Sequence, residues 1–341
     1  MHRYVLSCLL LLAATCAQAG MGFIELPGLQ GDGPVRVFYP SAGEEQQAQF
    51  GPYSLKLDRG GQPVRGNTRL VVISHGSGGL PWTYTDLSRR LVEDGFIVAF
   101  PQHRGDNTMD PSKPGPDSWK QRPAEVSRAI DAVAHDPRFA PLLSLDKVGM
   151  YGMSAGGHTA LTLAGGRWSP AMLGRHCEAH IAEDFHTCVG LTTRLTGGML
   201  DGVKKTVALA VIRQRFNDAA WQTHADPRIR AVVAGVPLAA DFDLASLASP
   251  PVPLGLVTAQ QDQWLVPRFH SGAVLQACKS CEHVADLPGG GHGALLSPPP
   301  PGNAMSALAK DLLLDPPGFD RSQLPAVDRK ISAFLRKHLI P

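Results

Sequence analysis

In residues 148–164 the chain reads VGMYGMSAGGHTALTLA. An apolar run comes first, a helix-forming run rich in small residues comes last, and the G-x-S-x-G pentapeptide 152–156 joins them. A serine in this pattern lies on a very sharp strand-to-helix turn with a strained backbone. Side chains two residues to either side would clash, so both places take glycine. The stretch therefore predicts a strand, a tight turn carrying Ser154, and a helix.

The segments on either side of this stretch repeat the alternation of strand and helix. Continuous apolar runs, typical of buried parallel strands, occupy residues 70–74, 96–100, 229–236 and 252–258, with shorter strands at 35–39 and 283–287. Amphipathic helices are expected at 86–93, after Pro123 in a first helical turn, and at 327–339. This order predicts an α/β fold, a mostly parallel, doubly wound sheet covered on both faces.

Two stretches interrupt the alternation. About sixty residues, 165–227, separate the helix after Ser154 from the next strand, which is too long for a connector in a compact domain. We expect an insertion with its own helices, lying like a cap over the end of the sheet. Residues 297–320, with four prolines in a row, are a second surface excursion. We predict one domain over residues 20–341 that contains the insertion.

The turn suits Ser154 to act as a nucleophile, because it pushes the hydroxyl out of the end of the sheet. It also aims the Ala155 N–H, at a helix N-terminus, towards the same spot, where it can bind an oxyanion. The second donor is expected from the loop 75–79, which follows a buried strand. The Ser77 N–H is the first choice and the Gly76 N–H the alternative. His75 is expected to be structural, because the base comes late in such chains.

The acid and the base of a triad are sought downstream of Ser154, in that order. Asp262 follows the strand 254–259 at its carboxyl end, where ligand sites of open α/β sheets lie. Asp241 and Asp243 follow the preceding strand and stay open as substitutes. The histidines beyond Asp262 are His270, His283, His292 and His338. His292 is the expected base, because it lies in the glycine-rich loop 289–293 just after the last strand.

Several segments resemble the α/β-hydrolase superfamily, in particular a bacterial branch related to dienelactone hydrolases and platelet-activating-factor acetylhydrolases. The matching pieces are residues 37–40, 74–79, 101–106, 122–127 and 151–161. Together they span about residues 35–295 apart from the insertion. The resemblance implies hydrolysis of carboxylic esters without a cofactor. Dienelactone hydrolases proper carry a cysteine nucleophile, so lactone specificity does not transfer to Ser154. Acetylhydrolases of this branch can take the acid from the earlier strand, which keeps Asp241 open.

The overall composition limits the partners of the chain. Of its 341 residues 43% are hydrophobic, and the formal net charge is +2 with no basic run. Nothing here favours nucleic acid, and no stretch after the leader is long and apolar enough for stable insertion into a membrane. A small-molecule or lipid ester is the expected substrate. We expect neither a metal nor another cofactor, and the oligomeric state is not readable from the sequence.

The first nineteen residues are typical of a cleavable signal peptide, with Arg3, a short apolar run and a small-x-small site ending at Ala19. An uncleaved anchor and a lipoprotein processed at Cys16 are the alternatives, though Thr15 fits the lipoprotein signal poorly. Export to the periplasm or outside the cell follows. Four cysteines remain after cleavage, and an even count in an exported chain indicates disulfides. Nearness pairs Cys177 with Cys188 and Cys278 with Cys281, but three pairings are possible. A metal site beside His176, His180 and His186 is the less favoured alternative.

These observations favour a serine esterase with a Ser154–His292–Asp262 triad and an acyl-enzyme intermediate. A peptidase or an acyltransferase could use the same triad. A binding protein that kept the fold without catalysis is a third possibility. Loss of Ser154, His292 or the glycines of the turn would favour the binding protein, and all of them are present.

Overall fold

A ten-stranded β-sheet runs through the computed structural model, which describes residues 20–341. The predicted signal peptide, residues 1–19, lies outside the described residues. The strands in chain order are β1 (Gly20–Leu26), β2 (Val35–Ser41), β3 (Gln46–Phe50), β4 (Tyr53–Arg59), β5 (Leu70–Ser74), β6 (Ile97–Pro101), β7 (Val148–Met153), β8 (Ile229–Gly235), β9 (Leu254–Ala259) and β10 (Glu282–Leu287).

The strand order across the sheet is β10-β9-β8-β7-β5-β6-β2-β1-β4-β3. All neighbours from β10 to β6 pair in parallel, whereas β2 is antiparallel to both β1 and β6. After β6 the chain returns to the other side of β5 to form β7, so the strand order reverses there. Such a reversal leaves a crevice at the carboxyl ends of the two strands, and Ser154 directly follows β7. The predicted fold class is confirmed: this is a sheet of the α/β-hydrolase type.

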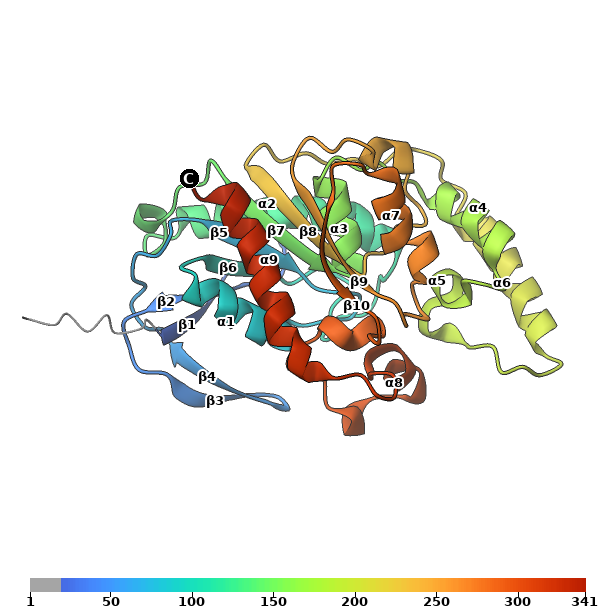
Figure 1. Cartoon of the computed structure of the whole chain (residues 1–341), viewed down its shortest axis with the longest axis horizontal. Coiled ribbons are helices and arrows are strands. Elements are labelled where there is room, and N and C mark those ends of the chain that lie inside the picture. Colours follow the sequence, from blue (N-terminus) through green and yellow to red (C-terminus); the bar gives the residue numbers. More distant parts are fainter. Residues whose placement is uncertain (1–19) are drawn as a thin grey trace, which may run out of the picture.

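Helices cover both faces of the sheet, and Figure 1 shows α1 and α9 together in front of it. The helices are α1 (Thr85–Glu93), α2 (Pro116–His135), α3 (Ala155–Leu163), α4 (Pro170–His180), α5 (Phe185–Val189), α6 (Asp201–Arg215), α7 (Ser271–Ala277), α8 (Ala307–Leu313) and α9 (Leu324–Leu339). Within residues 20–341, no helix has the length and apolar character needed to cross a membrane.

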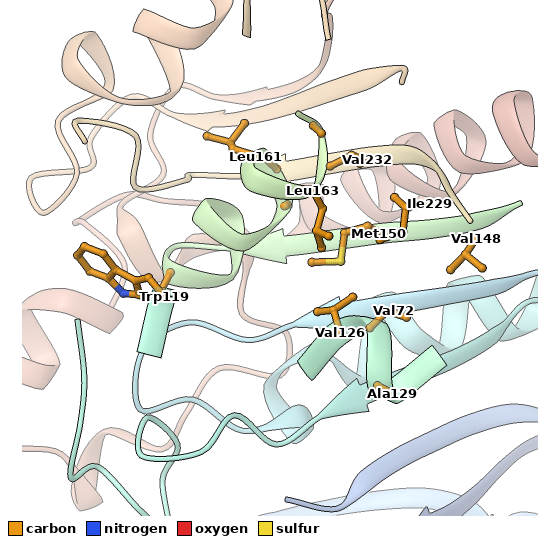
Figure 2. Close-up of a cluster of buried hydrophobic side chains, with 14 of the residues drawn as sticks. Val72, Trp119, Val126, Ala129, Val148, Met150, Leu161, Leu163, Ile229 and Val232 are labelled. Carbon is orange, nitrogen blue, oxygen red and sulfur yellow. The ribbon is translucent and has the colours of Figure 1, made fainter. Parts of the chain in front are cut away.

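The core lies in two layers, one on each face of the sheet. Along β5, Leu70 and Val72 belong to the layer under α2 and α3, while Val71 and Ile73 belong to the layer under α1 and α9. Successive side chains of a strand point to opposite faces, so a strand buried on both sides must be apolar throughout. Figure 2 shows the first layer, where side chains of β5, β7 and β8 meet those of α2 and α3. This packing fixes the strand ends that carry the site.

Some elements differ from the sequence-based expectation. Pro123 does not lie in a first helical turn: α2 begins at Pro116, so Pro123 is inside the helix. A proline there removes the hydrogen bond to the carbonyl of Trp119. A 20-residue helix with buried Val126, Ile130 and Val133 on its inner face tolerates that loss. Strands β1, β3 and β4 were not expected, and they extend the sheet beyond β2.

Residues 165–227, the expected insertion, contain α4, α5 and α6. Figure 1 shows these helices at one end of the molecule, next to α7 and away from β1 to β4. Two short bridges of Trp168, to Gln222 and to Phe242, close the base of the segment. The second predicted excursion, residues 297–320, contains α8, and an ion pair between Arg194 and Asp311 joins α8 to the first.

The packing of α9 on α1 contains a carboxyl group with an unusual pKa. Burial, together with the nearby charge of Asp86, raises the pKa of Asp328 from 3.8 to about 7. The folded protein therefore holds a proton that the unfolded chain releases, and stability falls as the pH rises from about 4 to about 7. Asp328→Asn removes this loss. We expect the free energy of unfolding of the variant at pH 8 to exceed that of the parent by about 2 kcal/mol. This is half of the free energy that corresponds to the whole pKa shift, because the side chain is only half-buried and solvent screens its charge.

The measurement is denaturant unfolding of parent and variant at pH 5, inside the titration range, where the loss of stability is still partial, and at pH 8, above that range, where the loss is complete. Glu44→Gln is the matched control, because Glu44 is exposed and makes no ion pair within the described part of the chain. The control should unfold like the parent at both pH values. An Asp328→Asn variant whose advantage is the same at pH 5 and at pH 8 would show that ionisation of Asp328 is not the cause.

Candidate active site

Ser154 occupies the strained turn that its sequence context predicts. Its backbone has φ 59° and ψ −120°, a conformation that costs a residue with a side chain free energy and persists only when its surroundings hold it. A Cβ atom on Gly152 would lie 1.9 Å from the Gly156 carbonyl oxygen, and one on Gly156 would lie 1.9 Å from the Ser74 carbonyl oxygen. Both glycines are therefore required for the close approach of β5, β7 and α3.

Backbone hydrogen bonds hold this turn from both sides. The Ser154 N–H donates to the Gly235 carbonyl at 3.1 Å, at the end of β8. The Ser154 carbonyl accepts from the N–H of His158 at 2.9 Å and from that of Leu238 at 3.2 Å. These bonds tie the backbone of Ser154 to α3, to the end of β8 and to the loop after β8, so the turn that carries the side chain is fixed by the sheet.

The structure brings His292 to this hydroxyl. His292 begins the short 3₁₀ turn η6 (His292–Leu295), which follows β10. Its Nε2 lies 2.9 Å from Ser154 Oγ, and its Nδ1 lies 2.7 Å from Asp262 Oδ2. Because an ionised carboxylate only accepts, Nδ1–H donates to Asp262 and Nε2 is free to accept the Ser154 hydroxyl proton.

Asp262 is held by its own loop. Its second oxygen, Oδ1, accepts from the backbone N–H of Trp264 at 2.8 Å and from that of Leu265 at 2.9 Å. The side chain is almost fully buried, as is that of His292. A buried carboxylate with this set of donors keeps one oxygen for the histidine and fixes the orientation of the ring.

The other candidate acids lie elsewhere. Asp241 is buried, but its Oδ2 lies 3.0 Å from Nε2 of His158, in the middle of α3, and not at His292. The His158 ring packs between Trp119, Trp168 and Phe242. Asp243 pairs with Arg167 at the base of the insertion, 2.6 Å between Oδ2 and a guanidinium nitrogen.

The remaining late histidines are also engaged away from Ser154. The Nε2 of His283 lies 2.8 Å from the Thr258 hydroxyl, and that of His338 lies 3.0 Å from Glu282 Oε1. His270 accepts from the Ala239 N–H with Nδ1. Of the four histidines considered, His292 is the one that the fold places beside the serine.

The loop after β5 lies against the serine. A Cβ atom on Gly76 would be 3.4 Å from Ser154 Cβ. The Gly76 N–H already donates to the Tyr84 hydroxyl at 3.1 Å. Within residues 20–341 the Ser77 N–H and the Ala155 N–H donate no hydrogen bond. Those two donors are therefore available to a carbonyl oxygen of a substrate.

A buried polar cluster, Ser74, His103, Asp106, Arg122 and Glu125, lies under this loop. Arg122 is fully buried and donates to the His75 carbonyl at 2.6 Å and to Asp106 Oδ2 at 2.9 Å. The other oxygen of Asp106 accepts from the Ser77 hydroxyl at 2.6 Å and from the Gly78 N–H at 2.9 Å. The Arg122–Asp106 pair thus clamps the backbone on both sides of Ser77.

The second half of the buried polar cluster anchors the end of β5. His103 Nε2 lies 2.7 Å from Ser74 Oγ, and His103 Nδ1 lies 2.6 Å from Glu125 Oε2. Burial, reinforced by the charge of Arg122, holds the pKa of His103 well below its ordinary value, and burial raises the pKa of Glu125. Both shifts favour the uncharged forms, which suit a dry interior.

Sequence reasoning did not assign roles to Asp106 and Arg122. The two segments that contain them, 101–106 and 122–127, were noted only as part of a resemblance. They meet in the structure, since Arg122 contacts Asp106 and Glu125 contacts His103. A buried guanidinium needs an acceptor at every N–H, so a charged residue on an otherwise apolar helix face was the available signal.

The insertion packs on the loop that holds Asp262. The His186 ring stacks on Trp264 with 3.9 Å between ring centroids, and the Thr187 hydroxyl donates to the Trp264 carbonyl. Asp184 is buried and accepts from His176 and from His270. Burial alone would raise the pKa of Asp184, but these two hydrogen bonds outweigh it and hold the pKa well below 3.8.

The cysteines are paired as nearness in the sequence predicts. Cys177 of α4 is bonded to Cys188 of α5, and Cys278 is bonded to Cys281 after α7. His176, next to the first disulfide, faces Asp184. Across residues 20–341, no group of three or more histidine, cysteine or acidic side chains is arranged to hold a metal ion. The thiols of this cluster, Cys177 and Cys188, are held in the disulfide.

Comparison with known proteins gives a fold and no closer relative. No protein-family model matches the chain, and no curated protein matches it. Many solved structures do resemble it, among them a ferulic acid esterase from Streptomyces cinnamoneus. The match covers 96% of this chain and 91% of that chain, with a TM-score of 0.58 and 17% sequence identity. At this identity the similarity extends to the fold, and it agrees with the α/β-hydrolase type of sheet described above.

Proposed function

We propose that the chain is a serine hydrolase that cleaves carboxylic esters, with Ser154 as nucleophile, His292 as base and Asp262 as the acid that orients it. The observation that carries the proposal is the continuous chain of hydrogen bonds from Ser154 through His292 to Asp262, with distances of 2.9 and 2.7 Å. Geometry of this kind, and not the fold, is what identifies such a triad.

The reaction follows from the protons that each group holds. Ser154 Oγ attacks the ester carbonyl while His292 Nε2 takes its proton. Asp262 stabilises the doubly protonated ring. His292 then gives the proton to the leaving alkoxide, which departs as the alcohol and leaves an acyl group on Ser154. Water, deprotonated by the same Nε2, attacks this ester, and the carboxylic acid leaves as the Ser154 hydroxyl re-forms.

The negative oxygen that develops in both steps needs donors that are already in place. The Ala155 N–H, at the N-terminus of α3, and the Ser77 N–H meet this need, because neither has an acceptor within the part of the chain that the structure describes. Each such donor contributes about 3 kcal/mol to the transition state.

A fluorophosphonate probe tests the proposal directly. We expect labelling of the protein, with the adduct mapped by mass spectrometry to Ser154. Turnover is then measured on aryl esters of increasing acyl length, and a feruloyl ester is included because the ferulic acid esterase shares the fold. Amide and acceptor-alcohol substrates separate the peptidase and acyltransferase alternatives. Silence towards the probe would favour a binding protein and contradict the proposal.

We further propose that the protein acts outside the cytoplasm. Two disulfides are compatible with an oxidising compartment. The leader that would direct export, with cleavage after Ala19, remains a prediction from the sequence. The dienelactone-hydrolase-like or acetylhydrolase-like branch likewise remains a prediction.

Asp106 is expected to position the oxyanion donor of Ser77 without touching the substrate. Asp106→Asn keeps the shape of the side chain but removes its charge, so Arg122 loses its ionic partner beneath the loop. We expect kcat to fall about tenfold to a hundredfold, because one oxyanion donor is misplaced, while KM changes less than about threefold.

The control for this variant is Arg128→Gln, which breaks an ion pair to Asp32 made by the same helix, α2. It should leave both kinetic constants near those of the parent. Michaelis–Menten kinetics, together with the thermal midpoint of unfolding, separate positioning from simple loss of folded protein. An Asp106→Asn enzyme with unchanged kcat would remove the positioning role.

A further inference from the structure

The helix α6 of the insertion exposes an apolar stripe. Five of the nine large hydrophobic side chains that are exposed in residues 20–341 lie on α6 or just before it: Met199, Leu200, Val203, Val207 and Val211. Val203, Val207 and Val211 recur every four residues, so they share one face of the helix. Val203 and Val207 are more than half exposed, at 58% and 56%. We refer to these five residues as the α6 stripe.

The opposite face of α6 already has a partner. Ile212 is buried in the core layer that contains α4, and Ala208 packs against the same layer. The stripe therefore cannot turn inward without exposing Ile212. Helix α6 itself lies at the edge of the molecule that is remote from β1 to β4 (Figure 1). An exposed apolar face on a helix that is fixed in this way indicates a surface made for contact.

Basic residues flank the α6 stripe. At 100° per residue, Lys204 and Arg215 border one side of the stripe and Arg213 borders the other. Lys204 is ion-paired with Asp201, and Arg213 is ion-paired with Glu178 of α4. Arg215 makes no ion pair within residues 20–341 and is therefore the flanking cation that can meet an anionic headgroup directly. The helix holds four basic residues (Lys204, Lys205, Arg213, Arg215) and one acid, Asp201, so its net charge is 4 − 1 = +3. An apolar face bordered by lysine and arginine is the pattern of a helix that lies in a lipid interface, where cations meet anionic headgroups.

We propose that the α6 stripe docks on an anionic phospholipid surface. A second copy of the chain is the poorer fit, because a helix about 22 Å long and about 10 Å wide offers far less than the roughly 800 Å² per partner of a stable dimer. Two copies would also bring like charges together across the interface. Binding to a lipid surface needs only a small apolar area, and a cation beside that area adds electrostatic attraction to the anionic headgroups.

Vesicle co-sedimentation tests this proposal without use of the esterase activity. The protein carries Ser154→Ala, so that ester cleavage cannot alter the lipid, and the binding result is independent of the proposed function. We expect binding to vesicles of phosphatidylcholine mixed with phosphatidylglycerol at low salt. The double variant Val203→Asp/Val207→Asp should bind at least about tenfold more weakly, because two apolar contacts become charges repelled by the headgroups.

Two controls separate the stripe from general stickiness. Met109→Asp changes an apolar side chain that is 83% exposed in another part of the molecule, and it should bind like the parent. Arg215→Gln should weaken binding, whereas Arg329→Gln, on α9, should not. Thermal unfolding of the Val203→Asp/Val207→Asp protein verifies that it is folded, as both positions are exposed.

Several results would overturn the proposal. They are failure of the parent to bind anionic vesicles at low salt, equal binding to pure phosphatidylcholine, and undiminished binding of the double variant. If light scattering showed that the parent is a dimer and the double variant a monomer, the α6 stripe would be assigned to contact with a second copy of the chain instead. Reduced binding at high salt, by contrast, is expected from screening of the flanking charges.

Discussion

Replacement of Ser154 by alanine is expected to lower kcat for ester hydrolysis by about 10⁴-fold or more. The substitution removes the attacking oxygen and leaves His292 Nε2 without the hydroxyl that lies 2.9 Å away. It keeps the Cβ atom, so the backbone of the turn, pinned by Gly235 and Leu238, has no new strain to relieve. Steady-state kinetics on an aryl ester give the loss, and the thermal midpoint of unfolding should stay close to that of the parent.

Ser74→Ala is the matched control, because Ser74 belongs to a second serine–histidine–carboxylate arrangement. Ser74, His103 and Glu125 resemble a triad in their hydrogen bonds, but all three are buried and open to no substrate. The Ser74→Ala protein should still react with a fluorophosphonate, and the Ser154→Ala protein should not. Activity near that of the parent in Ser154→Ala, or an adduct on Ser74, would refute the assignment.

The central strands of the sheet could be predicted from local sequence patterns. Apart from the exposed Arg230 near the start of β8, the strands β5 to β9 are short, mostly apolar runs that are buried on both faces. Such runs can be recognised in the sequence as buried strands. The turn at Ser154 could be predicted as well, because it requires glycine at positions 152 and 156. A Cβ atom at either position would collide with a backbone carbonyl oxygen. The expected order of serine, acid and histidine along the chain then limited the candidate acids and bases to a few residues downstream of Ser154.

The amino-terminal side of the sheet was harder to predict. The residues of β4, YSLKLDR, alternate between buried and more exposed positions, which is a pattern typical of strands. The pattern is weak here, because the strand has only seven residues and four of them are polar. β1 contains two glycines, and Gly22 packs directly against the Tyr39 ring, so close approach replaces side-chain pattern there. Such strands are specified by their neighbours in the sheet, which a local pattern does not contain.

Residue pairs far apart in the chain account for the rest. Arg122 and Asp106 are sixteen residues apart, and Ser74 and His103 are twenty-nine apart, yet each pair forms one buried contact. Asp241 was a reasonable substitute for the acid from its place after β8. Its carboxylate does not contact His292, because it is hydrogen-bonded to His158, a residue 83 positions earlier in the sequence. Tertiary packing alone decides between two aspartates that have similar local contexts.

Asp262→Asn is expected to lower kcat by about 10⁴-fold while the protein stays folded. The reason lies in the hydrogen bonds of the carboxylate. Its Oδ1 accepts from the N–H groups of Trp264 and Leu265, so an asparagine would turn its oxygen to these donors. Its NH₂ group would then face His292 Nδ1 and donate to it. The ring would carry its proton on Nε2, and it could not accept the proton of Ser154. The measurement is kcat on the aryl ester series.

Asp241→Asn is the paired variant, because it makes the same chemical change one strand earlier. Asp241 contacts His158 and not His292, so we expect kcat to change less than about tenfold, with a loss of about 1–3 kcal/mol in stability from the weakened buried pair. We therefore expect opposite results for the two variants. Asp262→Asn should lose turnover and keep a normal midpoint of unfolding, whereas Asp241→Asn should keep turnover and have a lowered midpoint. If Asp241→Asn abolished turnover while Asp262→Asn retained it, the acid would come from the earlier strand, and His292 would have to reach it through a rearrangement of the loop after β10.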